Sequence, residues 1–197
     1  MVTLSQRVER AIDEVGKNHF EEALLQAAIA IDVTAKNYFK SAKSSKSNYK
    51  QLLKDYSWLI ELMAFQGINL DDSRFGNYPI DGISEPSFQD LIYHTVRCNL
   101  VHGEGVPENF EFSDGNIFSM RKNHLILPKN LIWGLLAVVV FCSANSNHES
   151  GGGYWLGVFN NRFVIDDFWG QEQVIKRIYE NRKLTRVAII VPSGHMV

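Results

Sequence analysis

The sequence predicts a mainly α-helical domain with a small β-hairpin or sheet elaboration in its C-terminal third. Through most of the first hundred residues, apolar side chains recur every three or four positions, as in amphipathic helices packed on a common core. The longest apolar run, Leu131–Cys142, has twelve residues. It is shorter than the roughly 20 residues needed to span a bilayer, so it predicts a buried core helix. Near the C-terminus, short apolar runs separated by turn-forming residues predict hairpins.

The composition is that of an ordinary globular protein. The 197 residues are 45% hydrophobic and 21% charged, which suits one domain with a real core. The net charge of −2 and the pI near 6.3 argue against wholesale electrostatic capture of nucleic acid, but not against a local basic surface. Cys98 and Cys142 form neither a CxxC motif nor a disulfide framework, which indicates a reducing, cytoplasmic location. The polar N-terminus predicts no signal peptide.

Three helices are predicted at the N-terminal end. Leu4–Lys17, Phe20–Lys43 and Tyr49–Phe65 each show apolar residues at helical spacing. The stretch Ser41–Asn48, rich in serine and lysine, is predicted to be a loop. Aspartate, glycine, asparagine and proline are scattered through Ile68–Ser84, which predicts a long irregular connection.

The next helix is predicted to start after the signals in Ser84–Ser87 and to end at Gly103. Beyond it, a hairpin, a helix, a second hairpin, a helix and a strand are expected. Their predicted bounds are Ile117–Met120 with His124–Leu127, Lys129–Ala144, Tyr154–Phe159 with Arg162–Ile165, Gln171–Asn181 and Arg186–Val191. Asn145–Gly153 is predicted to be a loop. We expect a single domain over residues 1–197, with a bundle over about 4–145, a hairpin near 117–127 and an elaboration over about 153–197.

Chemically informative residues gather at the end of the helix that stops at Gly103. Arg97 keeps its positive charge at any ordinary pH, whereas His102 exchanges a proton near neutrality. Both are costly to bury without partners. A fixed cation beside a proton acceptor is what cleavage of an RNA phosphodiester needs. The simpler interpretation is that Arg97 pairs with a carboxylate and that His102 caps its own helix.

Arg97, four intervening residues, His102 and Gly103 resemble the signature of the HEPN superfamily. The predicted helix Phe20–Lys43 is also similar to an early bundle helix of such proteins, and the resemblance covers roughly residues 8–145. It implies an antiparallel helical bundle, a homodimer with a composite site, and metal-independent cleavage of RNA. A toxin–antitoxin, abortive-infection or other defence role, with an antitoxin protein as partner, is implied as well. Many active members carry a polar residue directly after the arginine, where this chain has Cys98.

The resemblance assigns roles to individual residues. His102 would move the proton, Arg97 would bind the scissile phosphate, and Asn99 would hold a phosphate oxygen. Asp32 is expected to contact Arg97, either as a structural salt bridge, which we favour, or to orient it. His94 would be a further polar group or a satisfied bundle histidine. The alternative is a non-catalytic HEPN-like module for dimerisation or for binding a nucleotide or partner.

Two further expectations concern the surroundings of this motif. Lysines recur every three or four residues from the last part of the second predicted helix onward. Of these, Lys36, Lys40 and Lys43 are candidates for RNA binding. A solvated surface would explain the same run. No metal site or cofactor is predicted, because His94 and His102 lack partners at metal-ligand spacing and no glycine-rich phosphate motif occurs.

The spacing of Arg97 and His102 poses a geometric problem, which two arrangements could solve. Five residues of an ideal α-helix advance by about 140° and about 7.5 Å, so Arg97 and His102 would not share a face. Unwinding at Gly103, or a second chain across a twofold axis, would bring them together. The family resemblance favours the second arrangement.

Overall fold

The computed structural model describes residues 2–76, 78, 80, 82–98, 110–114, 119–121, 124–158, 161–182 and 185–191. Its helices are α1 (Leu4–Gly16), α2 (Phe20–Tyr38), α3 (Lys46–Asp55), α4 (Ser57–Ala64), α5 (Phe88–Leu91), the π-helix η1 (Ile92–Cys98), α7 (Asn130–Phe141), the 3₁₀-helix η2 (Ser143–Asn145), α8 (Ile165–Phe168) and α9 (Glu172–Arg182). Its strands are β1 (Arg74–Phe75), β2 (Phe110–Ser113), β3 (Ser119–Arg121), β4 (His124–Pro128), β5 (Trp155–Val158), β6 (Asn161–Val164) and β7 (Ile190–Val191). The fold is mainly helical with small sheets, as predicted.

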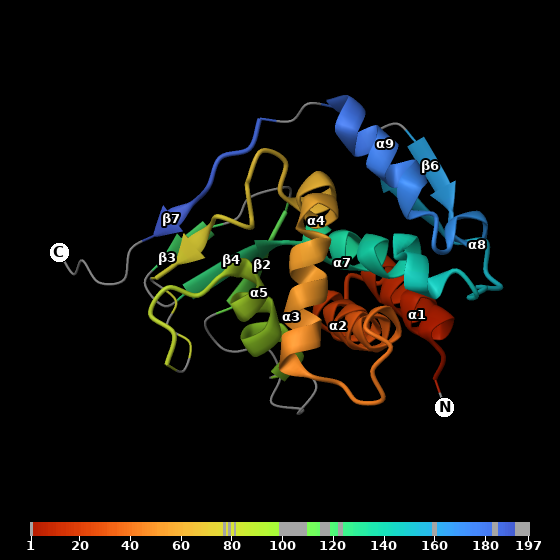
Figure 1. The fold of residues 1–197 in the computed structure, drawn as a ribbon, viewed down its shortest axis with the longest axis horizontal. Coiled ribbons are helices and arrows are strands. Elements are labelled where there is room, and N and C mark those ends of the chain that lie inside the picture. Colours follow the sequence, from red (N-terminus) through yellow and green to blue (C-terminus); the bar gives the residue numbers. More distant parts are fainter. Residues whose placement is uncertain are drawn as a thin grey trace.

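The helices form the centre of the molecule, around α2 and α7. Helix α2 packs against α1, α3, α7 and η1, and α7 also packs against α4. Figure 1 shows β2, β3, β4 and β7 on one side of this core, and β6 with α9 on the other. At the crossing of α7 and α4, a Cβ atom built on Gly134 would lie 3.4 Å from a side-chain carbon of Ile60, so a larger residue there would push the helices apart. Among the described residues, no helix is long and apolar enough to cross a membrane.

Two predicted helix limits are wrong. Helix α2 ends at Tyr38 and not at Lys43, because Lys40 takes a left-handed conformation (φ 48°) and Ser41 N–H closes the helix by donating to the Lys36 carbonyl at 2.9 Å. Helix α3 then begins within the predicted loop, where the Ser45 hydroxyl caps it by accepting from Asn48 N–H.

The predicted helix Tyr49–Phe65 is divided into α3 and α4 at Tyr56. The Tyr56 side chain is buried, and its hydroxyl donates to Glu172 of α9 at 2.7 Å. A bond between residues so far apart in the sequence leaves no trace in local periodicity, which explains the error.

The helix predicted to end at Gly103 starts as expected but is wound differently. Ser87 and Asp90 form a capping box at the start of α5. From Ile92 to Cys98 the helix is π-wound, so its hydrogen bonds join residues five apart instead of four. The assumption of ideal α-helical winding is therefore wrong for Ile92–Cys98. The separation of about 140° between Arg97 and His102 cannot be compared with the structure, because Asn99–His102 lie outside the described residues.

Both predicted hairpins are confirmed in their strands. β3 pairs with β4 and β5 pairs with β6, each antiparallel. The sequence did not predict β2, which pairs parallel with β4 to make a three-stranded sheet in the order β2-β4-β3. It also did not predict β1, which lies in the supposed irregular connection and pairs parallel with β7. The predicted helix Gln171–Asn181 is confirmed as α9, whereas only Ile190–Val191 of the predicted strand Arg186–Val191 forms a strand.

Candidate functional site

Arg97 lies one residue before the end of η1. Of the predicted Arg97–His102 motif, the structure describes only Arg97 and Cys98. The Nε atom of Arg97 lies 4.0 Å from Oδ1 of Asp32 on α2, and the two side chains are 21% and 16% exposed. Its guanidinium carbon lies 5.7 Å from the ring centroid of Tyr93. The predicted contact between Arg97 and Asp32 is confirmed. Asp32 also accepts a short hydrogen bond from the Ser44 hydroxyl, which holds the carboxylate in place.

A fully buried tyrosine, Tyr49, lies close to Arg97 and Asp32. Tyr49 of α3 has 0% exposure, and its hydroxyl finds no hydrogen-bond partner among the described residues. Burial raises the pKa of this hydroxyl strongly, the Asp32 carboxylate raises it further, and Arg97 opposes both. Its ring packs edge-on against Tyr93 at 5.5 Å between centroids. Tyr49 therefore stays neutral, and its ring contact helps to hold Tyr93 in position.

His94 contacts a second cation near Tyr93, the ammonium of Lys46. The Lys46 ammonium lies 2.9 Å from Nε2 of His94 and 5.6 Å from the Tyr93 ring centroid. An ammonium can only donate, so Nε2 accepts and the imidazole carries its proton on Nδ1. Lys46 and Arg97 thus both approach the ring of Tyr93.

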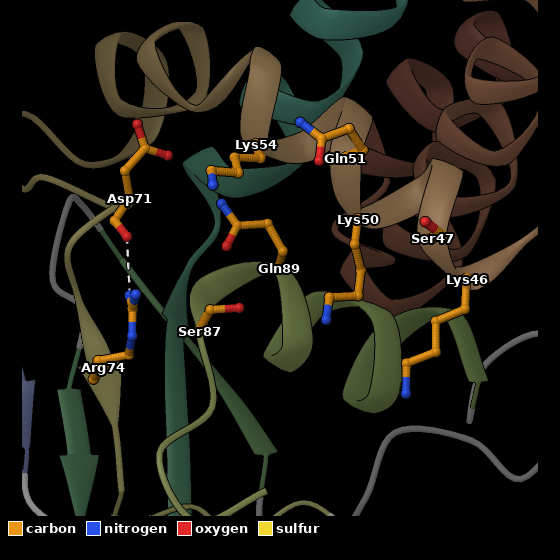
Figure 2. Close-up of a pocket in the computed structure, with 9 residues that line it drawn as sticks. All are labelled: Lys46, Ser47, Lys50, Gln51, Lys54, Asp71, Arg74, Ser87 and Gln89. Atoms are coloured by element: carbon orange, nitrogen blue, oxygen red, sulfur yellow. Dashed lines mark hydrogen bonds between the residues drawn. The ribbon is translucent and has the colours of Figure 1, made fainter. Parts of the chain in front are cut away.

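Lys46 also lines a basic cleft of about 630 Å³, which lies between α3 and the segments around β1 and α5 (Figure 2). The cleft is lined by Lys46, Ser47, Lys50, Gln51, Lys54, Asp71, Arg74, Ser87 and Gln89. The three lysines recur every fourth residue of α3, so they lie on one face of the helix. The cleft therefore carries a row of cations from one element and Arg74 from another.

Besides Lys46, which donates to His94, two of these cations are held by other groups. The Lys50 ammonium donates to Asp90 at 2.5 Å, and the Arg74 guanidinium donates to the backbone carbonyls of Asp71 and Ser73 at 2.9 and 2.7 Å. Burial acts to raise the pKa of Asp90, but the hydrogen bonds from Lys50 and Ser87 together bring it below its usual value. Lys54, by contrast, is exposed and has no carboxylate within 4.0 Å in the described part of the chain.

Comparison with known proteins decides the family. A model of the Rv1289 family matches residues 3–192. The chain belongs to the Rv1289 family. It is 24% identical over 199 aligned positions to the uncharacterised protein Rv1289 of Mycobacterium tuberculosis and to the uncharacterised protein Mb1320 of Mycobacterium bovis, and each alignment covers 95% of this chain and 93% of the relative. No solved structure matches this chain.

In this Rv1289-family chain, the lysines that the sequence singled out for RNA binding do not line the cleft. Lys36 is half-buried in the last turn of α2, and Lys40 and Lys43 are exposed in the loop that follows. The predicted residues Asn99, His102 and Gly103 lie outside the described residues. Within the described ranges, no three His, Cys, Asp or Glu side chains gather as metal ligands would.

Three residues of this site were missed by sequence reasoning. Tyr49 marked only the start of a predicted helix, Tyr93 had no predicted role, and Arg74 lay in a connection predicted to be irregular. The spacing of Lys46, Lys50 and Lys54 was visible in the sequence, because every fourth position of a helix faces the same side. Their position opposite Arg74 was not visible in the sequence, because it depends on where β1 lies in the fold.

Proposed function

We propose that this protein is a metal-independent endoribonuclease of the HEPN type, in which Arg97 and His102 carry the chemistry. The observation that carries the proposal is the setting of Arg97. Asp32 approaches it at 4.0 Å, which is beyond hydrogen-bond reach, so the carboxylate holds the cation by charge, and the guanidinium shows no hydrogen bond to another residue that the structure describes. The side chain is also 21% exposed, which leaves it open to a phosphate.

The π-helical winding of η1 supports the same proposal. Such turns occur frequently at functional sites, and this one ends at Cys98, directly after Arg97. The homodimer remains part of the proposal through the family resemblance.

In the proposed reaction, the ribose 2′-oxygen attacks the adjacent phosphorus and the bond from phosphorus to the 5′-oxygen breaks. His102 accepts the proton of the 2′-hydroxyl or returns one to the leaving 5′-oxygen. Arg97 binds the phosphate and stabilises the additional negative charge of the pentacovalent state, and Asn99 holds a phosphate oxygen. The products are a 2′,3′-cyclic phosphate and a 5′-hydroxyl. A toxin–antitoxin or other defence role, with an antitoxin protein as partner, follows from the family resemblance.

One observation favours a second candidate function. Cys98 directly follows Arg97, where many active HEPN proteins have a polar residue, and it is half-buried beside Tyr93. The alternative is a non-catalytic module that uses Arg97 to bind a nucleotide or a partner.

Cleavage of mixed RNA in the presence of EDTA separates the two functions. We expect the wild type to cleave, His102→Ala and Arg97→Ala to abolish cleavage, and Arg10→Ala, an exposed arginine on α1, to cleave normally. The cut ends should resist poly(A) polymerase until a phosphatase that opens cyclic phosphates has acted. A wild type that cuts no RNA across a broad panel, or cuts only with added Mg²⁺, would contradict the nuclease and favour the binding module.

A further inference from the structure

We propose that the basic cleft along α3 binds phosphate groups of single-stranded RNA, so that the strand runs from Arg97 past Tyr93 into the cleft. The inference rests on the proposed function in naming the path of its substrate. Binding in the cleft is nevertheless a separate property, because it requires neither His102 nor Arg97.

The charge of the cleft calls for an anion. Lys46, Lys50, Lys54 and Arg74 line it, and Asp71 is the one acidic residue among the nine lining residues. Asp90 neutralises Lys50 from outside the lining, and Asp71 lies 3.9 Å from Arg186. Lys54 has no carboxylate within 4.0 Å in the described ranges. A phosphate would supply the charge that Lys54 lacks.

A buried and unpartnered donor gives independent support. Gln89 is only 5% exposed, and its Nε2 has no hydrogen-bond acceptor among the described residues. In Figure 2 the amide of Gln89 points from α5 toward the end of the Lys54 side chain. A buried donor without an acceptor is unfavourable, and neither Gln89 Nε2 nor the Lys54 ammonium can accept from the other. A phosphate oxygen between them would accept from both.

The size and position of the cleft favour a strand over a free ion. About 630 Å³ is the volume of a small-ligand site and exceeds what one phosphate fills. Lys46 lies at the end of the cleft and contacts His94 and Tyr93, and Arg97 contacts the same tyrosine ring. Successive lysines on α3 are separated by four residues, or about 6 Å along the axis. This regular row suits successive phosphates of an extended strand. A free nucleotide would need only one end of it.

The test measures binding of a fluorescein-labelled 2′-O-methyl RNA by fluorescence anisotropy. This RNA lacks the 2′-hydroxyl, so it cannot be cleaved and binding is read alone. Wild-type protein is compared with Lys54→Ala and Gln89→Glu over a range of salt concentrations, with Arg10→Ala as the control for loss of one surface cation. Free AMP and inorganic pyrophosphate are tested in parallel as competitors.

We expect Lys54→Ala to weaken RNA binding at every salt concentration and to reduce the slope of log Kd against log salt by about 0.7, the share of one phosphate contact on a single strand. Gln89→Glu should also weaken binding, because it replaces a donor with a negative charge of the same shape. Arg10→Ala should match the wild type. The melting temperatures of Lys54→Ala and the wild type should agree, since Lys54 is exposed and forms no ion pair with any described residue.

An RNA affinity and salt slope that Lys54→Ala leaves unchanged would overturn the proposal. AMP or pyrophosphate binding without any binding of the RNA would also overturn it, in favour of a small-molecule site. The result is separable from the nuclease. RNA binding that depends on Lys54, without any cleavage, would support RNA binding in the cleft and refute the nuclease. Cleavage of RNA, with a binding affinity that Lys54→Ala leaves unchanged, would support the nuclease and refute RNA binding in the cleft.

Discussion

The carboxylate of Glu61 accepts two hydrogen bonds of 2.7 Å from the guanidinium of Arg186, which lies 125 residues further along the chain. Glu61 also accepts from the backbone N–H of Leu70 at 2.8 Å. One carboxylate, 3% exposed, therefore joins α4, the loop that follows it and the C-terminal segment. The pair holds β7 where it can meet β1.

Arg186→Ala should lower the free energy of unfolding by roughly 3–5 kcal/mol, because it leaves Glu61 buried without its cation. Burial already raises the pKa of Glu61 and Arg186 opposes that rise, so the pKa should rise further in the variant. A carboxyl group whose pKa is raised in the folded state destabilises that state least when it is protonated. The loss of stability should therefore shrink as the pH falls below that pKa. Urea denaturation at several pH values measures this, with exposed Arg177→Ala on α9 as the control; equal stabilities of the two variants would contradict it.

Asp32→Ala should lower both stability and any RNA cleavage. Removal of the carboxylate leaves Arg97 partly buried without its countercharge and the Ser44 hydroxyl without its acceptor. A fully buried pair would cost more, but at 4.0 Å and with partial exposure we expect a loss of about 1–2 kcal/mol. Asp32→Asn keeps an acceptor for Ser44 and should lose less stability. Thermal unfolding of both variants checks the order, and equal losses would show that the hydrogen bond from Ser44 adds no stability beyond that of the charge.

Arg97→Lys should recover little of the cleavage lost in Arg97→Ala. An ammonium is a point charge and cannot donate two parallel hydrogen bonds to two phosphate oxygens, as a guanidinium does. Single-turnover cleavage rates of the two variants decide this. A lysine variant with near wild-type rate would mean that Arg97 supplies charge alone.

Stability in acid should depend on Asp90. Its pKa is below the usual value in the folded state, so its contribution is fully present above the unfolded pKa of about 4 and is lost as the pH falls through the folded pKa. Asp90→Asn should be less stable than wild type at neutral pH and should lose less on acidification below about pH 4. The pH profile of the unfolding midpoint measures both, and parallel profiles would contradict the prediction.

The protein should be a homodimer in solution, with the helix that carries Arg97 at or beside the twofold axis. Light scattering at micromolar concentration measures the mass directly. A purely monomeric species would remove the dimer from the proposal.

The sequence by itself determined the elements whose cause is local. Helix α1 follows from apolar residues at helical spacing and a capping box between Thr3 and Gln6. Helix α7 follows from an apolar run too short for a membrane, and both hairpins follow from turn-forming residues between short strands. The contact of Arg97 with Asp32 was also predictable, because a charge on the apolar face of one helix needs a partner of opposite sign on another.

The tertiary structure alone decided what depends on residues far apart in the chain. Tyr56, where α3 ends and α4 begins, bonds to Glu172 of α9, and the π-winding of η1 changes which residues share a face without any local proline or glycine to announce it. The basic cleft exists because β1 brings Arg74 opposite α3. The bond from Tyr56 and the cleft both join side chains of separate elements, and a sequence read residue by residue carries no record of which elements will meet.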